Sequence, residues 1–179
     1  TYEWDFGDGN QSTNEDPAHL YGAAGNYTVK MKAITIEGCV DSTQEPVVVY
    51  PLPVADFTVA ETCFGDSTSF SDNSTVSSGT ISDYDWSFGD GATTTMKDKR
   101  HQYATTGQYS VQLVVTTGTG GCRDTVTKDV EVFPVPKAQF SLTNACQDDE
   151  VAYNNQSTTT SDTLLYQWNF GDGMTATTE

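Results

Sequence analysis

One six-residue motif occurs three times in this chain at a constant interval, and this repetition constrains the fold more than any other feature. The motif W-x-F-G-D-G occupies residues 4–9, 86–91 and 168–173, so the step from the first copy to the second equals the step from the second to the third. This interval of roughly 80 residues corresponds to a whole small domain and exceeds the roughly 20–45 residues of a solenoid repeat. The sequence therefore predicts a tandem array of small domains.

Residues downstream of the motif repeat in the same register. An H-x-Y triplet occurs at residues 19–21 and 101–103, and a G-x-Y triplet occurs at 25–27 and 107–109. Farther along, the interval between equivalent cysteines and prolines is longer by a single position, which is expected where a surface loop gains one residue. The repetition thus extends over whole domains.

Two P-x-P segments, at residues 51–53 and 134–136, mark the predicted domain boundaries. Proline fixes φ and favours an extended backbone before it, so these segments should form short, semi-rigid linkers. We expect the C-terminal part of one repeat at 1–50 (the first repeat), a complete repeat at 54–133 (the central repeat) and the N-terminal part of another at 137–179 (the third repeat). The chain is thus expected to be part of a longer protein.

Apolar residues alternate with polar ones in several segments of the central repeat, which is the pattern of half-buried strands. Turn residues separate these segments every 8–12 residues or so, as in β-sandwiches, and no segment has a helical period. The sequence predicts an all-β sandwich with Trp86, Phe88, Tyr109 and Leu113 in its core, and Tyr109 resembles a tyrosine corner. The expected strands are 55–59, a stretch around Phe70, 84–88, 109–115 and 126–132.

The combination of W-x-F-G-D-G, H-x-Y and G-x-Y-x-V resembles the PKD domain, the repeat of polycystic kidney disease, over essentially the whole chain. The sequence G-C-x-D at 38–41 and a cysteine after the first strand are similar to tandem PKD repeats of surface adhesins and motility proteins of gliding bacteria. The resemblance implies tandem immunoglobulin-like β-sandwiches, a secreted or cell-surface location, type IX secretion, and a spacing, adhesive or accessory role.

We interpret the recurring motif residues as structural. The aspartate should accept hydrogen bonds from its own turn, while the glycines adopt positive φ. No second acid stands at a fixed spacing to serve as a catalytic partner, and His19 and His101 have no neighbouring metal ligands in the sequence. No nucleophile elbow, P-loop or zinc-protease motif is present, so no enzyme activity and no cofactor are predicted. The structural residues are Trp4, Phe6, Asp8, Trp86, Phe88, Asp90, Trp168, Phe170, Asp172, Tyr27 and Tyr109.

The chain is strongly acidic, with a net charge of −17 from 25 acidic and 8 basic residues. This charge argues against binding to nucleic acid or to anionic membranes, and no apolar run is long enough to insert into a membrane. The simplest interpretation is a solvated extracellular surface. Calcium binding by Asp83, Asp85 and Asp90, or by the acids at 148–150, is an alternative, although neither group matches an EF-hand loop.

The four cysteines, Cys39, Cys63, Cys122 and Cys146, form an even set, which favours disulfides in an extracellular chain. We place Cys63 in the first hairpin turn and Cys122 in a later turn at the opposite end of the sandwich, about 20–27 Å away. Because a disulfide needs Cα atoms within about 7 Å, we expect bonds to cysteines of adjacent repeats outside this chain. Cys39–Cys63 with Cys122–Cys146, and bonds between chains, remain alternatives.

Aspartate followed by serine or threonine occurs four times and resembles the O-glycosylation signal of the same bacterial group. The candidate residues are Ser42, Ser67, Thr125 and Thr163. In a chain rich in serine, threonine and aspartate, a pattern this short also arises by chance.

Three functions follow from these observations. The first is a structural or adhesive stalk or filament whose partners are neighbouring repeats, other copies of the chain and an unidentified protein or carbohydrate ligand. The second is an accessory region of a secreted hydrolase, and the third is a linker stiffened by calcium.

Overall fold

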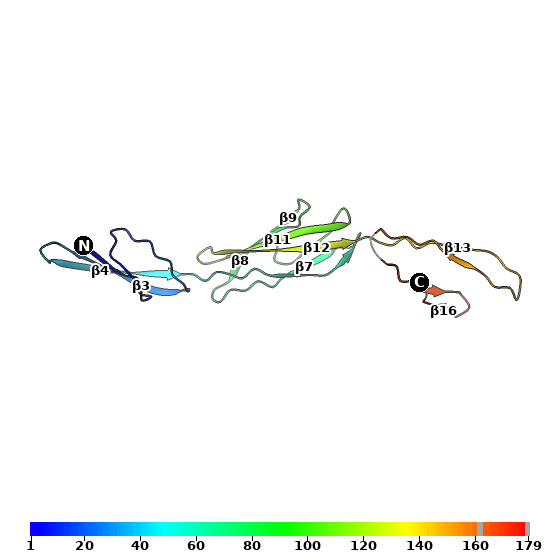
Figure 1. Cartoon of the computed structure of the whole chain (residues 1–179), viewed down its shortest axis with the longest axis horizontal. Coiled ribbons are helices and arrows are strands. Elements are labelled where there is room, and N and C mark those ends of the chain that lie inside the picture. Colours follow the sequence, from blue (N-terminus) through cyan, green and yellow to red (C-terminus); the bar gives the residue numbers. More distant parts are fainter. Residues whose placement is uncertain (161–162, 178–179) are drawn as a thin grey trace. The chain divides into compact units, whose positions relative to one another are not determined.

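The computed structural model describes residues 1–160 and 163–177 (Figure 1), and these residues form strands, turns and loops but no helix. The all-β class predicted from the sequence is confirmed. By internal contacts, the chain divides into one compact unit of Thr1–Phe57, Asn73–Asp85 and Leu113–Val126, and a second of Thr58–Asp72, Trp86–Gln112 and Thr127–Glu179. The central repeat contributes to both units.

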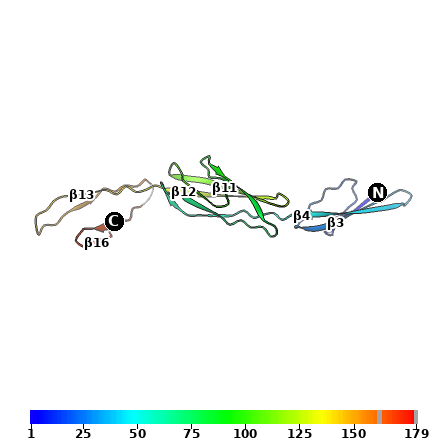
Figure 2. The same cartoon turned by 180° about the vertical axis from the view of Figure 1, so that it is seen from behind.

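The first repeat forms an antiparallel sheet with the strand order β2-β1-β3-β4. β3 and β4 form a long antiparallel hairpin, and both views of the structure show them side by side (Figures 1 and 2). Their register runs from Gly25 opposite Val49 to Ile34 opposite Val40. The strands are β1 (Tyr2–Asp5), β2 (Gln11–Ser12), β3 (Gly25–Ile34) and β4 (Val40–Val49).

The central repeat has two sheets, with the strand orders β10-β7-β5 and β6-β12-β11-β8-β9, which is the arrangement of an immunoglobulin-like sandwich. The expected strands coincide with β5, β7, β8, β11 and β12. The strands are β5 (Phe57–Val59), β6 (Thr62–Cys63), β7 (Thr68–Asp72), β8 (Ile81–Ser87), β9 (Thr93–Thr94), β10 (Lys99–His101), β11 (Gly107–Thr117) and β12 (Arg123–Phe133).

Aromatic rings from both sheets form the centre of the second unit. Phe70 on β7 lies 5.8 Å from Trp86 and 5.1 Å from Phe88, measured between ring centroids. Each of the three side chains is at most 2% exposed, so their burial contributes several kcal/mol, at roughly 1.5–3 kcal/mol for a fully buried large side chain. In the first unit, alternating residues of β11, Leu113 and Val115, are also fully buried.

The third repeat forms two short hairpins within the described residues. Phe140 pairs with Asn155 in the first hairpin, and Trp168 pairs with Ala176 in the second. The strands are β13 (Phe140–Leu142), β14 (Tyr153–Asn155), β15 (Trp168–Asn169) and β16 (Thr175–Ala176).

Candidate functional site

The aspartate of the repeated motif closes its own turn in all three repeats. Asp90 follows β8, and its Oδ1 accepts a hydrogen bond from the backbone N–H of Ala92 at 2.9 Å. A bond to the N–H two residues ahead forms an Asx turn, which fixes the loop from within. The same bond occurs at Asp8 from the N–H of Asn10 (3.0 Å) and at Asp172 from the N–H of Met174 (2.9 Å).

The glycine before this aspartate is required for two reasons. Gly89 has φ of 81°, which side-chain-bearing residues rarely adopt, and a Cβ at this position would lie 2.7 Å from the carbonyl oxygen of Ser110. Gly7 repeats this geometry against Thr28, also at 2.7 Å. The motif therefore brings the turn close against the backbone of the neighbouring long strand.

A histidine reaches the other oxygen of the same carboxylate. Nε2 of His101 lies 2.7 Å from Oδ2 of Asp90, and Nε2 of His19 lies 2.7 Å from Oδ2 of Asp8. Neither of these pairs was predicted, because the aspartate lies eleven residues before the histidine in the chain. The signal that could have revealed both pairs is the identical spacing of aspartate and histidine in the two repeats.

These hydrogen bonds keep the two carboxylates ionised. The bond from His19 is the main cause that lowers the pKa of Asp8 to about 2, from 3.8, and the N–H of Asn10 adds to it. Burial acts to raise the pKa of Asp90, but the bonds from Ala92 and His101 outweigh it, so this pKa is also lowered. An ionised carboxylate accepts both bonds more strongly than a protonated one.

Aromatic rings enclose the imidazole. His101 stacks on Phe88 with centroids 4.3 Å apart, and Tyr103 meets it edge-on at 4.6 Å. The Tyr103 hydroxyl donates to the Phe88 carbonyl at 3.2 Å, and burial raises its pKa, so it stays protonated. The first repeat has the same stack, with Phe6–His19 at 4.1 Å, His19–Tyr21 at 4.7 Å and Tyr21–Tyr27 at 4.3 Å.

Tyr109 lies near the start of the long strand β11 and has the hydrogen bond of a tyrosine corner. Its hydroxyl donates to the Thr105 carbonyl at 2.9 Å, and Tyr27 donates in the same way to Ala23 at 2.9 Å. Tyr109 is only half-buried, so its predicted place in the core was wrong. The ring stacks on Tyr103 at the edge of the sandwich, because its hydroxyl must reach the preceding loop.

The Asp–His–aromatic cluster is composed of groups that hold the motif turn in place. A catalytic triad needs a hydroxyl or thiol on the imidazole, and within residues 1–160 and 163–177 neither histidine has such a neighbour at hydrogen-bond distance. The same described residues contain no group of three histidine, cysteine or acidic side chains that could hold a metal ion. This includes Asp83, Asp85 and Asp90 and the acids at 148–150, which were the calcium candidates.

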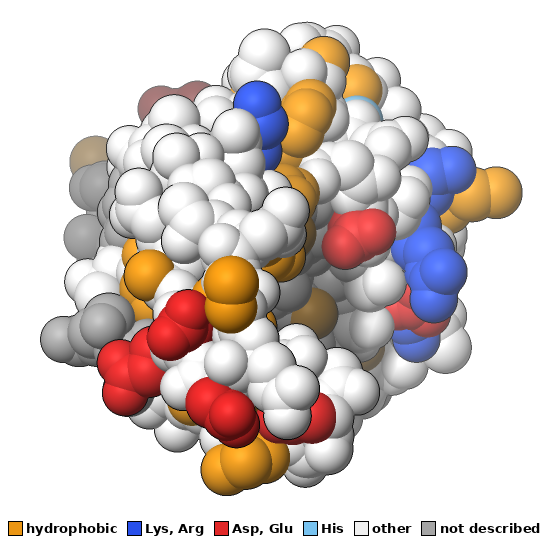
Figure 3. Space-filling model, turned by 90° about the vertical axis from the view of Figure 1, so that its right-hand side faces the viewer, with side chains coloured by type: hydrophobic (Ala, Val, Ile, Leu, Met, Phe, Trp, Pro, Cys, Tyr) orange, Lys and Arg blue, Asp and Glu red, His pale blue; other side chains and the backbone are white. Residues whose placement is uncertain are grey.

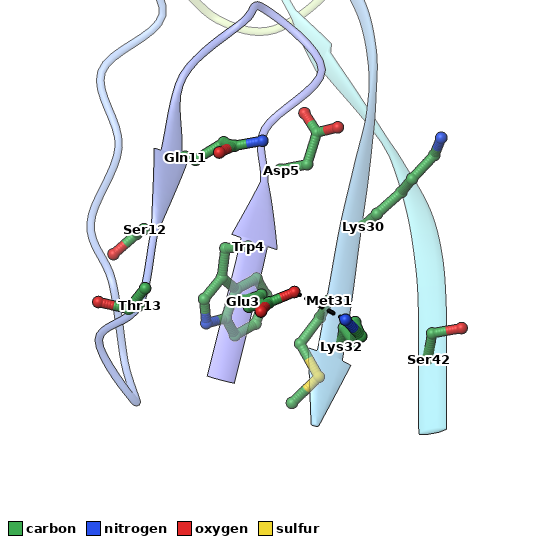
Figure 4. Close-up of a pocket in the computed structure, with 10 residues that line it drawn as sticks. All are labelled: Glu3, Trp4, Asp5, Gln11, Ser12, Thr13, Lys30, Met31, Lys32 and Ser42. Atoms are coloured by element: carbon green, nitrogen blue, oxygen red, sulfur yellow. Dashed lines mark hydrogen bonds and ion pairs between the residues drawn. The ribbon is translucent and has the colours of Figure 1, made fainter. Parts of the chain in front are cut away.

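A pocket of about 410 Å³ lies over the sheet of the first repeat (Figure 4). Trp4 and Met31 lie close together at its wall, beside the ion pair between Lys32 and Glu3 at 3.0 Å. The equivalent residues of the central repeat, Trp86 and Leu113, are buried at 2% and 0% exposure. The pocket is therefore the core-facing side of the sheet, which the central repeat covers with its second sheet.

A similar pocket of about 380 Å³ occurs in the third repeat, lined by Phe140, Tyr153 and Trp168 among others. Tyr153 occupies the position of Phe70 in the repeat, and Trp168 occupies the position of Trp86, both of which are core residues in the central repeat. Neither pocket therefore has the character of a ligand site.

The linker before the central repeat is held by the turn between β11 and β12. Gly120 in this turn has φ of 83°, and a Cβ there would lie 2.4 Å from the ring of Tyr50. Sγ of Cys122 lies 4.0 Å from the carbonyl oxygen of the same tyrosine. We call this contact among Tyr50, Gly120 and Cys122 the linker joint.

All four cysteines are free thiols, and each is exposed or half-buried. Cys122 lies in the β11–β12 turn, as predicted, where Thr117 donates its N–H to the Cys122 carbonyl at 2.9 Å. Cys63 lies in the connection between β5 and β7, as predicted, and its carbonyl accepts a turn hydrogen bond from the N–H of Asp66 at 3.1 Å. It also belongs to β6, which pairs in parallel with the end of β12. Local sequence did not reveal this pairing, since β6 has only two residues.

The four glycosylation candidates, Ser42, Ser67, Thr125 and Thr163, are all exposed residues. Asp162, which precedes Thr163, lies outside the described residues. Within the described part of the chain, no helix has the length and apolar character needed to span a bilayer.

Comparison with known proteins gives matches in bacterial proteases. A microbial collagenase of Vibrio alginolyticus is 47% identical over 57 residues, which are 31% of this chain and 7% of the collagenase. Collagenase ColA of Bacillus cereus is 41% identical over 49 residues, which are 27% of this chain and 5% of that protein. The chain therefore corresponds to less than a tenth of the length of either relative.

Two solved structures of single PKD domains are also similar. The PKD1 domain of Vibrio anguillarum Epp is 31% identical, with a TM-score of 0.43, over 45% of this chain and 93% of that domain. The PKD1 domain of the Vibrio cholerae metalloprotease PrtV is 34% identical, with a TM-score of 0.42, over 45% of this chain and 96% of that domain. The sequence model of the PKD domain matches residues 1–49 and 51–132, well over half of the chain. The chain belongs to the PKD domain family.

Proposed function

We propose that this chain is a mechanical spacer of an extracellular protein, in which tandem PKD repeats joined by stiff linkers hold other parts of the protein at a set separation. The observation that supports this proposal most directly is the anchoring of the linkers. In the part of the chain that the structure describes, both P-x-P segments are followed at once by the same backbone contacts.

The first linker is fixed on both sides. Before it, Tyr50 packs against Gly120 in the linker joint. After it, Val54 and Thr75 exchange two backbone hydrogen bonds, of 2.7 and 2.9 Å. Only residues 51–53 lie between these anchors, and the two prolines there have φ fixed by their rings. A linker with so few free dihedral angles restricts bending between repeats.

The second linker is followed by the same anchor. Lys137 and Thr158 exchange backbone hydrogen bonds of 2.8 and 3.0 Å, and these residues occupy the positions of Val54 and Thr75 in the next repeat. The serine beside this anchor also repeats, since Ser157 accepts a bond from the N–H of Gln139 at 3.0 Å, as Ser74 does from Asp56. The anchor is therefore a property of the repeat.

The surface is compatible with an extracellular spacer that also carries binding surface or sugar. Charged residues are only 18% of the chain, and most of the face in Figure 3 is neither acidic nor basic, with most acidic side chains at its lower left and most basic ones at its right. A net charge of −17 favours solubility. The proposed partners are neighbouring PKD repeats, other copies of the chain and an unidentified protein or carbohydrate.

The test measures the stiffness of the first linker by double electron–electron resonance between spin labels. The four native cysteines are replaced by serine, and labels are attached through Lys30→Cys and Asp129→Cys, both at exposed positions of strands. We expect a narrow distance distribution that broadens when Pro51→Gly and Pro53→Gly are combined. Leu52→Ala is the matched control, because Leu52 is 70% exposed and its replacement leaves both prolines in place. An equally broad distribution in all three proteins would contradict the spacer.

A second function is favoured by the names of the relatives: the repeats would be an accessory region of an extracellular protease. Two similar curated proteins are collagenases, and one similar solved domain comes from a metalloprotease. Gelatin zymography of the complete protein from its native source tests this function. A clearing band at the mass of the complete protein supports it, and inactivity together with further repeats of the same kind in place of a catalytic domain favours the spacer alone.

A further inference from the structure

We propose that successive repeats are joined by a disulfide between the cysteine at the Cys63 position of one repeat and the cysteine at the Cys122 position of the next. This inference rests on the proposed function, because it requires repeats in tandem. The surroundings of the two cysteines are seen at different linkers of this chain. In both cases the cysteine lies beside the last residue before a P-x-P segment.

The first half is seen before the second linker, at Phe133. The short strand β6 runs parallel to the end of β12, with Cys63 as the Cα partner of Phe133. The N–H of Phe64, the residue after the cysteine, donates to the Phe133 carbonyl oxygen at 2.7 Å. Cys63 is thus held beside the residue from which the chain leaves the central repeat.

The second half is seen before the first linker, at Tyr50. Tyr50 and Phe133 are equivalent positions of successive repeats, since each directly precedes a P-x-P segment. Sγ of Cys122 lies 4.0 Å from the Tyr50 carbonyl oxygen, and the tyrosine ring is seated against Gly120 of the same turn. Cys122 is thus held beside the residue from which the chain leaves the preceding repeat.

The two observations place two cysteines at one carbonyl group. In an array, the oxygen that accepts the N–H after the first cysteine is also the oxygen that the second thiol touches. A disulfide needs Cα atoms about 4.4–6.8 Å apart, and two cysteines that approach the same carbonyl group from successive repeats are brought towards this separation. Both thiols are accessible, since Cys63 is exposed and Cys122 is half-buried.

The remaining cysteines follow the same rule. Cys39 lies in the β3–β4 turn, where it occupies the position that Cys122 has in the central repeat. Cys146 occupies the position of Cys63 in the third repeat. The central repeat therefore carries one cysteine for the joint before it, Cys122, and one for the joint after it, Cys63. This arrangement accounts for four thiols that form no bond with one another within the chain.

The bond forms by thiol–disulfide exchange with an oxidised dithiol oxidoreductase. One cysteine thiolate attacks a sulfur of the oxidoreductase disulfide and forms a mixed disulfide, and the second cysteine thiolate then displaces the oxidoreductase sulfur. Two S–H bonds are lost and one S–S bond is formed in the repeats. The oxidoreductase takes up the two electrons, its disulfide becomes two thiols, and the two protons pass to these thiols or to solvent.

The decisive experiment is peptide mapping by mass spectrometry, without reduction, on the complete protein from its native source. We expect the peptide containing Cys122 to be linked to the peptide containing the cysteine of the preceding repeat that corresponds to Cys63. A free Cys122 thiol, or a bond from Cys122 to Cys39, Cys63 or Cys146, would overturn the proposal.

A second experiment tests the geometry in the 179-residue chain itself. Cys39, Cys63 and Cys146 are replaced by serine, and Tyr50→Cys is introduced beside the remaining Cys122. We expect oxidised glutathione to convert both thiols to a disulfide, seen as the loss of two hydrogens in the intact mass. Val48→Cys, at an exposed position of the preceding strand, is the matched control and should keep both thiols or form mixed disulfides with glutathione.

The two proposals fail in distinguishable ways. If Tyr50→Cys reacts no differently from Val48→Cys, residue 50 is not held beside Cys122 and the disulfide is overturned. The spin-label experiment contains none of the native cysteines, so a narrow distance distribution there supports the spacer whether or not the disulfide exists.

Discussion

The central and third repeats contain the same aromatic cluster in the same local geometry but differ in burial. The rings of Trp86 and Phe88 stack 6.2 Å apart at 10°, and those of Trp168 and Phe170 stack 6.4 Å apart at 6°. Phe88 is 1% exposed, whereas Phe170 is 37% exposed. The short motif strand and the turn after it therefore set the stacking of the tryptophan and phenylalanine rings. Burial of these rings requires long strands such as β11 and β12, which have no counterpart among the described residues after 136.

The largest difference between the two repeats is expected for the tryptophan. Trp86→Ala should lower the free energy of unfolding by about 3–5 kcal/mol, because it leaves a cavity among buried rings. Trp168→Ala should cost roughly 1 kcal/mol or less, because its surroundings are already open to water. Urea unfolding followed by circular dichroism measures both values. Equal losses would show that the third repeat has a closed core in solution.

The glycine before the motif aspartate gives a second comparison between the central and third repeats. Gly89 and Gly171 have φ of 81° and 84°, but only at Gly89 would a Cβ meet another atom within 4 Å, the Ser110 carbonyl oxygen at 2.7 Å. Gly171→Ala should therefore cost only the backbone strain of about 1–2 kcal/mol, and Gly89→Ala should cost more. Gly91→Ala is the control within the central repeat, since φ there is 94° and the space is open. Thermal melts rank the three variants, and equal shifts would contradict the close approach.

The tyrosine corner extends the comparison to the first repeat. Tyr109→Phe removes the hydroxyl that donates to the Thr105 carbonyl and also lies 2.8 Å from the Thr105 hydroxyl, which should cost about 1 kcal/mol or slightly more. Tyr27→Phe removes the same bond to Ala23 and should cost a similar amount. The unfolding midpoints of both variants in urea measure these effects. A loss confined to Tyr109→Phe would show that the corner needs a complete sandwich behind it.

The smallest expected effect is on the pH dependence of stability. The folded-state pKa of Asp8 is about 2 and its ordinary value is 3.8, so its stabilising contribution is present above pH 3.8 and is lost as the pH falls towards 2. Asp8→Asn should flatten the dependence of the unfolding midpoint on pH in this window. His19→Gln removes the main cause of the shift and should flatten it similarly, whereas an unchanged slope in both variants would contradict the pairing.

The strands were predictable because alternation along the chain directly reports which face of a strand is buried. The constant interval between motif copies likewise revealed the family, since the whole motif set recurs in register. The Asp90–His101 pair was not predicted, because its members are joined by a loop whose path depends on the ring of Phe88. The parallel pairing of Cys63 with Phe133 was also missed, because strand partners distant in sequence leave no local pattern.

Gly120 of the linker joint leaves room for the ring of Tyr50, so this single residue decides whether the preceding linker can pack against the turn. The corresponding turn of the first repeat closes one residue sooner, from Thr35 to Cys39 rather than from Thr117 to Cys122, and carries Glu37 where the central turn carries Gly120. A side chain at this place leaves no seat for an aromatic ring from the preceding linker. Under the proposed spacer function, a linker whose aromatic residue packs on a glycine at this position would bend less than a linker that meets a side chain there, so the sequence of each repeat would set the flexibility of the linker before it.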